Sequence, residues 1–316
     1  MAASRKTRCA SSSRPTVSRE RTRAFRGGLI AAWLCAGACA TTPPPAAGVS
    51  KGTPPSDPGP RIEEVPGVDL AELTDVERQT WTDLVNAAPS PCGEPASVAR
   101  CAQKADRCRS CGVAARYLRR LVMDGFDRDT LQEQYEGRFG RGGAVSISLD
   151  DARVRGAAQG RVTVVVFSDF QCPYCGQAHP LLARLLKAHR DRVRMVFKHY
   201  PLAGHPRAMP AARAAEAARL QGRFWEMHDH LFEHQDALED ADLERYAAVV
   251  GLDLPKFRAD MSSAEVQARI DLDRAEGASL GIEGTPTLFI GGRRFRESLR
   301  TLETYLQEEV ERDDIP

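Results

Sequence analysis

After its first 39 residues, the chain is divided into three stretches by the spacing of its apolar and polar residues. Residues 40–66 are rich in Pro and Gly and contain almost no large apolar side chains. A stretch of this composition cannot bury a core, so we expect a linker.

Residues 67–141 show the apolar spacing that is typical of amphipathic helices. The first helix is expected to begin at Thr74-Asp75-Val76-Glu77, which has the form of a capping box. Two further helices are predicted over 113–123 and 129–139, and Gly125 suits the turn between them. The pattern therefore predicts a small helical module, and this module contains four cysteines.

From residue 142 to 316, short apolar runs alternate with helical patterns. A helix is expected after Cys175, a long helical insert over about 208–277, and a last helix over 299–310. The expected strands cover 145–149, 162–167, 193–198, 287–290 and 294–295. This order predicts an α/β fold in which a helical subdomain is inserted before the last strands of the sheet.

The first 39 residues are expected to be an export signal, because a basic segment precedes a short apolar run and then small residues. The run is too short to span a membrane, which takes about 20 apolar residues. Ala36-Gly37-Ala38-Cys39 resembles the lipobox of bacterial lipoproteins, which would make Cys39 a lipidated N-terminus and the membrane a partner. Ala38-Cys39-Ala40 also fits an ordinary cleavage site, and a cytosolic tail is the remaining alternative. We expect a periplasmic or cell-envelope protein.

Charge excludes one class of partner. Eight of the 44 basic residues lie in the first 39 positions, where Glu20 is the one acidic residue, so the rest of the chain has a net charge of −6. Without a basic face, this part is not expected to bind nucleic acid.

Candidate chemistry begins with Cys172-Pro173-Tyr174-Cys175, which follows the expected strand 162–167 and opens a helix. A cysteine at a helix N-terminus is favoured as a thiolate, so this pair is a candidate redox site. Six cysteines remain once the signal is removed, and an even number in an oxidising compartment allows two structural disulfides beside one redox pair.

Four motifs in order resemble the DsbA-like thiol:disulfide oxidoreductases. They are Phe167-Ser168-Asp169-Phe170-Gln171-Cys172-Pro173-Tyr174-Cys175, Phe197-Lys198-His199-Tyr200-Pro201-Leu202, Gln221-Gly222-Arg223-Phe224-Trp225-Glu226-Met227-His228 and Gly284-Thr285-Pro286-Thr287. The resemblance implies a thioredoxin fold with an inserted helical subdomain, no cofactor, and cysteine-containing protein substrates together with a separate redox partner.

The resemblance also suggests roles for residues. Cys172 is expected to be the exposed thiolate that attacks, and Cys175 the buried partner that resolves the mixed disulfide. Pro286 is expected to be cis and to face the pair, with Thr285 meeting the substrate through its backbone. Pro173 and Tyr174 complete the expected substrate-binding surface, and Asp169 and Glu226 are candidates for modulating Cys175.

The four module cysteines, Cys92, Cys101, Cys108 and Cys111, are expected to form structural disulfides, for which three connectivities are possible. Alternatively, they form a second redox centre, because residues 108–140 loosely resemble the helical thiol-oxidoreductase domain of cytochrome c maturation. A zinc site that joins Cys108 and Cys111 to Cys172 and Cys175, or an inert disulfide at the latter pair, is a further alternative.

No metal site is expected, although His230 and His234 share one helix face at a spacing that can hold a metal. The leading hypothesis is an exported thiol:disulfide oxidoreductase, with the direction of electron flow left open. Alternatives are a non-catalytic binding or assembly lipoprotein built on the same fold, and a copper-delivery or cytochrome-assembly factor.

Overall fold

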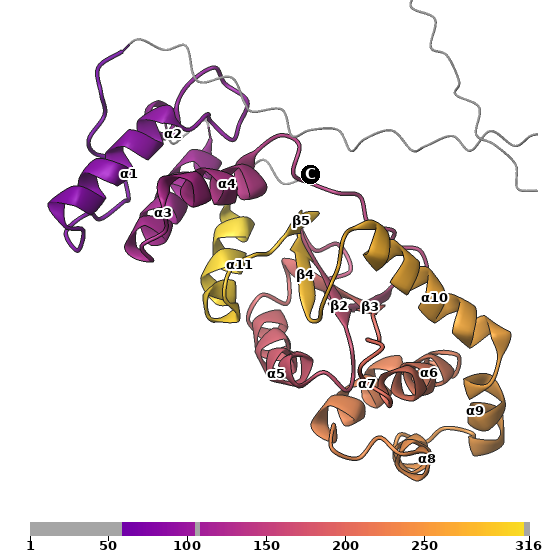
Figure 1. The fold of residues 1–316 in the computed structure, drawn as a ribbon. Helices are drawn as coiled ribbons and strands as arrows, with labels where there is room; N and C mark the ends of the chain where they lie inside the picture. The colour runs from indigo at the N-terminus through magenta and orange to yellow at the C-terminus, as the bar shows by residue number, and fades with distance from the viewer. Residues whose placement is uncertain (1–58, 105–107, 313–316) are drawn as a thin grey trace, which may run out of the picture. The chain divides into compact units, whose positions relative to one another are not determined.

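The computed structural model describes residues 59–104 and 108–312 (Figure 1). The expected signal, Cys39 and most of the expected linker lie outside the described residues. Within the described residues, no helix combines the length and the apolar character that crossing a membrane requires.

The first helices, coloured indigo to magenta in Figure 1, are α1 (Asp75–Ala87), α2 (Val98–Ala102), α3 (Arg109–Met123) and α4 (Arg128–Phe139). The capping box at the start of α1 is confirmed, since the Thr74 and Glu77 side chains each bond the other's backbone. Helix α2 was not predicted, because five residues are too few to show a helical period.

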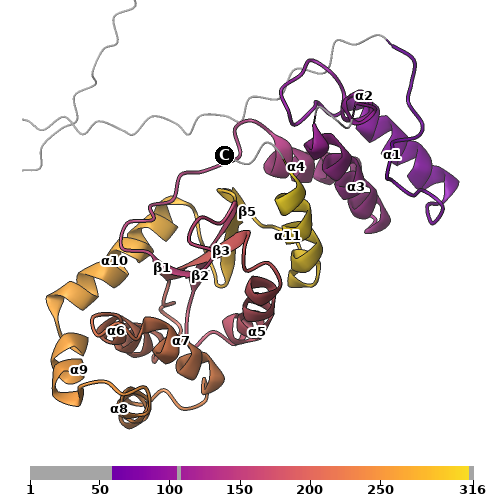
Figure 2. The same cartoon turned by 180° about the vertical axis from the view of Figure 1, so that it is seen from behind.

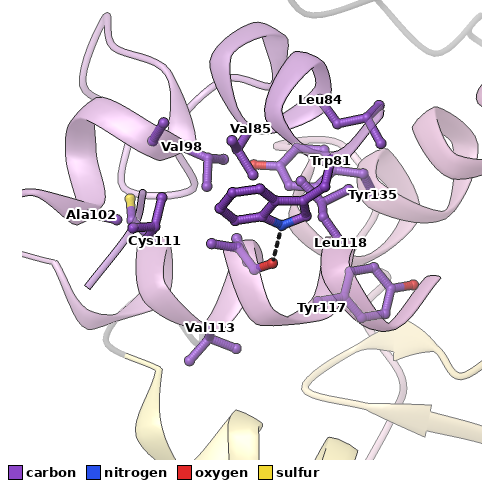
Figure 3. Close-up of a cluster of buried hydrophobic side chains, with 14 of the residues drawn as sticks. Trp81, Leu84, Val85, Val98, Ala102, Cys111, Val113, Tyr117, Leu118 and Tyr135 are labelled. Carbon is purple, nitrogen blue, oxygen red and sulfur yellow. Dashed lines mark hydrogen bonds between the residues drawn. The ribbon is translucent and has the colours of Figure 1, made fainter. Parts of the chain in front are cut away.

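These helices pack around Trp81, whose side chain is fully buried (Figure 3). The indole Nε1 donates a hydrogen bond to the Ala115 carbonyl in α3 at 3.0 Å, so the polar atom of this buried ring has a hydrogen-bond partner. Leu118 and Tyr135 lie in the same buried cluster, which ties α1, α3 and α4 together.

The remaining chain forms a five-stranded sheet of order β1-β3-β2-β4-β5. β2 and β3 are parallel, and the other neighbouring pairs are antiparallel. The strands are β1 (Arg153–Gly156), β2 (Val162–Ser168), β3 (Val193–His199), β4 (Thr287–Ile290) and β5 (Arg293–Arg294).

The strand expected over 145–149 is wrong. Val145 and Leu149 are exposed, and the Val145 N–H donates to the Gly292 carbonyl at 2.8 Å without forming a strand. The first strand instead begins at Arg153, a buried charged residue whose guanidinium pairs with the Asp273 carboxylate at 2.8 Å. Periodicity of apolar residues gives no signal for a strand that buries an arginine.

Helices cover both faces of the sheet, because β2 is apolar on both sides. Val162, Val164 and Val166 pack against α5 (Pro173–Ala188) and α11 (Leu302–Glu311), which follows the short helix η1 (Leu299–Thr301). Phe167, on the opposite face, lies against α10 at Gly277, where an added Cβ would meet its ring at 3.2 Å. Figure 1 shows α5 and α10 on opposite sides of the strands.

The helical insertion positions the candidate site. It consists of α6 (Ala208–Arg219), α7 (Phe224–Glu233), α8 (Asp240–Val249), α9 (Leu254–Met261) and α10 (Ala264–Ser279), close to the expected insert over 208–277. Buried residues of α6 to α9 share one core with Phe170, Phe197, Cys172 and Cys175. Figure 2 shows α6 to α9 gathered beyond one end of the strands.

A buried arginine links α4 to α11. Arg138 places its guanidinium 3.5 Å from the centre of the Tyr305 ring and 2.8 Å from carboxylate oxygens of Glu308 and Glu309. All these groups are buried, so the charges are compensated by one another rather than by water.

Candidate active site

The site lies where β2 ends and α5 begins. Cys172 is the N-cap residue of α5 and Pro173 occupies the first helical position, where the missing N–H of proline is no loss. Both Cys172 and Cys175 are free thiols in this structure. The positive end of the helix therefore faces the Cys172 sulfur.

The expectation that Cys172 is exposed is wrong: its side chain is 3% exposed. The reason is that the Thr285–Pro286 segment covers it, with Cys172 Sγ 3.3 Å from the Thr285 carbonyl oxygen. The Thr285–Pro286 peptide bond is cis. Pro173 and Tyr174 are exposed beside it, and Tyr174, at 66%, is among the most exposed large side chains described.

The two thiols have opposite acidities. A hydrogen bond from the Cys175 side chain, with further help from Thr285 and from the Cys175 and Tyr174 backbone, lowers the pKa of Cys172 to about 5. Burial and the neighbouring Cys172 sulfur strongly raise the pKa of Cys175. At neutral pH, Cys172 is therefore a thiolate and Cys175 a thiol that donates to it.

Thr285 also offers a donor of its own. Its Oγ1 is buried and has no hydrogen-bonding partner in the structure, yet this side chain lowers the pKa of both cysteines. A buried hydroxyl without a partner is costly, so the thiolate is its natural acceptor. Thr285 thus contributes a side chain to the site in addition to the expected backbone.

The loop before Cys172 is held by Asp169. Its buried carboxylate accepts hydrogen bonds from the Gln171 N–H at 2.7 Å and the Leu202 N–H at 2.9 Å, and lies 2.7 Å from His205 Nδ1. The Asp169 backbone also hydrogen-bonds Cys175 and lowers its pKa.

Gln235, in the insertion, supports the same loop and was not found from the sequence. Its Nε2 donates to the carbonyl oxygens of Phe170 at 2.7 Å and Cys172 at 3.0 Å. Gly176 makes room for it, because an added Cβ would lie 1.9 Å from Gln235 Oε1. Only the folded insertion brings this residue to the site, more than 60 positions away in sequence.

A small cavity lies behind the buried thiol. Its volume is about 20 Å³, close to that needed for one water molecule. The polar side chains that line it together with Cys175 are Arg155, Ser168, His179 and His228.

Two imidazoles at this cavity share one carboxylate. Asp229 Oδ1 lies 2.8 Å from His228 Nδ1 and 3.2 Å from His179 Nε2, while Arg155 Nη2 lies 2.7 Å from Asp229 Oδ2. Burial lowers the pKa of His228 to about 4, so this imidazole is neutral at neutral pH. His179, His228 and Asp229 have ligand atoms close enough to hold a metal, but Arg155 already supplies a cation to Asp229.

Glu226 is not part of the site, contrary to expectation. It is exposed and pairs with Arg223 at 3.0 Å. His230 and His234 lie on the same helix end, with Glu233 completing a group whose ligand atoms lie within 4.8 Å of one another.

The four module cysteines form two disulfides, Cys92–Cys108 and Cys101–Cys111. This pairing is one of the three connectivities that the sequence allowed. It contradicts the zinc alternative, because the Cys108 and Cys111 sulfurs are bonded to other cysteines.

Comparisons with known proteins agree on one part of the chain. A family model described as "Thioredoxin" matches residues 148–308. The curated relatives include the Na(+)/H(+) antiporters NhaA 3 of Salinispora tropica, 49% identical over 153 residues, and NhaA 1 of Salinispora arenicola, 47% identical over 156 residues. These matches cover 48% and 49% of this chain but only 23% and 24% of the antiporters, so the chain spans about a quarter of their length.

Solved structures show a similar likeness. A thioredoxin-like oxidoreductase from Silicibacter pomeroyi is 35% identical with a TM-score of 0.45, over 51% of this chain and 90% of that protein. BdbD from Bacillus subtilis is 21% identical with a TM-score of 0.47, over 53% of this chain and 96% of that protein.

Proposed function

The chain belongs to the thioredoxin family whose model it matches over residues 148–308, and we propose that it is an exported thiol:disulfide oxidoreductase acting on protein cysteines. Its fold is the expected thioredoxin fold with a helical insertion, preceded by helices that contain cysteines. We place the boundary between the helical module and this domain near residue 142.

One observation carries the proposal: the opposite acidities of two free thiols at the start of α5. Cys172 has a pKa of about 5, and Cys175 beside it is held protonated. A reactive thiolate next to a protonated reserve thiol is the arrangement that two-step disulfide exchange requires. An inert disulfide has no need of it.

The exchange proceeds through a mixed disulfide. The Cys172 thiolate attacks one sulfur of a substrate disulfide, forms a bond to it and expels the other sulfur as a thiolate. Cys175 then loses its proton and attacks Cys172 Sγ, which forms the Cys172–Cys175 disulfide and releases the second substrate sulfur. Run in reverse, the same steps transfer the disulfide to a substrate dithiol.

The surface around Cys172 supports a polypeptide substrate. Exposed Pro173 and Tyr174 lie on one side and the Thr285–Pro286 segment on the other. An extended chain that displaced the contact between Cys172 Sγ and the Thr285 carbonyl would bring its own sulfur to the thiolate. Because recognition there would use backbone groups, many cysteine-containing proteins would fit.

The acidity of Cys172 also supports a direction. Attacking cysteines have pKa values near 7 in thioredoxin and near 3.5 in DsbA, whose potentials are about −270 and −120 mV. The pKa of about 5 for Cys172 lies between these two values, so we expect a potential between about −270 and −120 mV. Structural disulfides of exported proteins lie below about −300 mV, so the pair would donate its disulfide to them.

Export is proposed on two grounds. The first 39 residues have the order of an export signal. The two disulfides of the module are of the kind that persists in oxidising compartments such as the periplasm. Lipidation at Cys39, which would tether the protein to a membrane, remains part of this proposal. The transport activity of the antiporter relatives is not carried over, because the chain spans about a quarter of their length.

Turnover of a peptide dithiol by the oxidised protein in a glutathione buffer tests the proposal. We expect Cys172→Ser to abolish turnover, and we expect the glutathione ratio at half oxidation to give a potential between about −270 and −120 mV. Full turnover by Cys172→Ser would refute the proposed role of Cys172, and no turnover by the unaltered protein would favour a scaffold. A potential below about −300 mV would leave the chemistry intact and reverse the direction.

A further inference from the structure

The four cysteines of the helical module form a cluster in which two disulfides touch. Cys92–Cys108 and Cys101–Cys111 are the bonded pairs, and Cys108 Sγ lies only 3.5 Å from Cys111 Sγ. The sulfurs of Cys92, Cys108 and Cys111 all lie within 4.8 Å of one another. A sulfur released from one disulfide is therefore already in contact with the other.

Cys108 is placed to leave and to attack as a thiolate. It is the N-cap residue of the 15-residue helix α3, and its side chain makes no capping hydrogen bond. The positive end of the helix lowers the free energy of a thiolate at this position. Cys108 and Cys111 thus repeat the arrangement of Cys172 and Cys175 at α5, with two residues between the sulfurs and the first cysteine at the N-cap.

A second observation concerns Cys111. The hydroxyl oxygen of Ser90 lies 3.3 Å from Cys111 Sγ and accepts the Cys92 N–H at 3.2 Å. Because the Cys111 sulfur is disulfide-bonded and carries no hydrogen, the Ser90 hydroxyl is the donor in this contact. Such a donor stabilises the share of negative charge that Cys111, as the central sulfur, carries in the transition state of the exchange.

Solvent and other proteins can reach the four-cysteine cluster through Cys92. Cys101, Cys108 and Cys111 are at most 2% exposed, whereas Cys92 is half-buried and lies in the loop before α2. A thiolate from outside therefore reaches Cys92 first. Attack at Cys92 expels Cys108, the sulfur at the helix N-terminus and so the better leaving group.

We propose that the four-cysteine cluster is a second thiol–disulfide exchange centre, in which a dithiol reduces Cys92 and the remaining disulfide moves to Cys108–Cys111. One donor thiolate attacks Cys92 Sγ, breaks the Cys92–Cys108 bond and releases the Cys108 thiolate. The second donor thiol then attacks the donor sulfur of the mixed disulfide, so the donor leaves oxidised and Cys92 becomes a thiol. Two electrons have entered the cluster.

The internal step follows without a further reductant. The Cys108 thiolate attacks Cys111 Sγ, the Cys101–Cys111 bond breaks, and the Cys108–Cys111 bond forms. Cys101 leaves as a thiolate and takes up a proton. The product holds one disulfide in the Cys-x-x-Cys of α3 and free thiols at Cys92 and Cys101.

We expect the helical module to stay folded after this rearrangement of its disulfides. Figure 3 shows Cys111 at one end of the buried cluster, near Val98 and Ala102, with Trp81 between it and Tyr135. The hydrogen bond that joins Trp81 to α3 is accepted by the Ala115 carbonyl and does not involve either disulfide bond. One remaining disulfide within α3 therefore leaves the contacts among α1, α3 and α4 in place.

The test uses the full chain with Cys172→Ser and Cys175→Ser, so that its failure is independent of the proposed function. The oxidised protein is treated with one equivalent of dithiothreitol, quenched with acid, alkylated and digested with trypsin, which cleaves after Lys and Arg. The sequence places each cluster cysteine in a different tryptic peptide, namely 79–100, 101–104, 108–109 and 110–116.

We expect a species in which peptides 108–109 and 110–116 are linked while Cys92 and Cys101 carry the alkyl label. Finding only the two original links and fully reduced protein would overturn the proposal, since structural disulfides are lost together as the module unfolds. In a second variant, Cys92→Ser with Cys101→Ser, we expect the Cys108–Cys111 disulfide to form with unchanged intrinsic tryptophan fluorescence. Free thiols at both positions in a folded variant would likewise contradict exchange.

Ser90→Ala tests the hydroxyl, with Ser90→Thr as the matched control that keeps it. Loss of one hydrogen bond to sulfur should slow appearance of the Cys108–Cys111 link about fivefold in the alanine variant. The threonine variant should retain the original rate. Equal rates in all three proteins would contradict the assigned role of Ser90.

Discussion

The hydroxyl of Thr285 is predicted to set part of the acidity of Cys172. Thr285→Val replaces Oγ1 with a methyl group of similar size and removes a buried donor that has no other partner in the structure. The thiolate then loses a side chain that lowers its pKa, whereas the thiol form loses nothing. We therefore expect the pKa of Cys172 to rise.

The magnitude follows from the charge on the acceptor. A hydrogen bond to a charged group contributes about 1.5–3 kcal/mol, and we take the lower end because the structure gives the Thr285 hydroxyl no hydrogen bond to Cys172 Sγ. About 1.4 kcal/mol corresponds to one pKa unit, which moves the pKa of Cys172 from about 5 to about 6. At pH 5.5 the thiolate fraction should fall from about three quarters to about one quarter. The reduction potential should fall by about 30 mV, since the reduced form loses stability.

Ultraviolet absorbance of the thiolate, followed against pH in the reduced protein, measures this shift directly. Thr285→Ser is the matched control, because it keeps the hydroxyl and should keep a pKa near 5. An unchanged pKa in Thr285→Val would refute the reasoning. It would leave the Cys175 thiol and the backbone of α5 as the sources of the low pKa.

Three further predictions concern stability. The pKa of Cys172 is lowered from its ordinary value of 9.0 to about 5 by folding, so the Cys172 thiolate stabilises the reduced protein at alkaline pH. This stabilisation should be lost as the pH falls through about 5. Urea unfolding of the reduced and oxidised proteins at several pH values should show this dependence in the reduced form only. Trp81→Ala should lower the free energy of unfolding by about 3–5 kcal/mol, and Trp81→Phe by less, as measured by urea titration. Arg138→Ala leaves the Glu308 carboxylate buried without that partner, so it should lower the free energy of unfolding by about 3–5 kcal/mol at neutral pH. The loss should be smaller at acidic pH, where the carboxylate is protonated. An equal loss of unfolding free energy at both pH values would contradict the ionic account.

The sequence predicted those elements whose signal is local. β2 is a run of apolar residues, α1 opens on a capping box, and Cys172 to Cys175 stand at a strand-to-helix junction. In each case neighbouring residues alone determine the conformation. The Cys pair could therefore be located without knowledge of the fold.

The sequence failed where distant residues decide the outcome. The burial of Cys172 comes from Thr285, 113 positions away, and the support of its loop comes from Gln235 in the insertion. β1 begins on Arg153, whose burial is compensated by carboxylates from two insertion helices. No local pattern encodes these contacts.

The pairing of the module cysteines shows the same limit. Four cysteines allow three connectivities, and spacing does not choose among them. The choice of Cys92–Cys108 and Cys101–Cys111 depends on how α2 and its preceding loop pack on α3. Helix α2 itself was not predicted, so the pairing could not be either.

Trapping the exchange intermediate tests the central claim most directly. Cys175→Ser, incubated with a disulfide-bonded peptide, should accumulate a mixed disulfide of one peptide thiol on Cys172, because the resolving sulfur is absent. Mass analysis of the tryptic peptide 162–184, which contains Cys172, would identify the adduct. Cys172→Ser should form no such adduct at Cys175, because the raised pKa of Cys175 keeps its thiol protonated. An adduct on Cys175 in that variant, or none on Cys172 in the first, would contradict the assignment of attacking and resolving sulfurs.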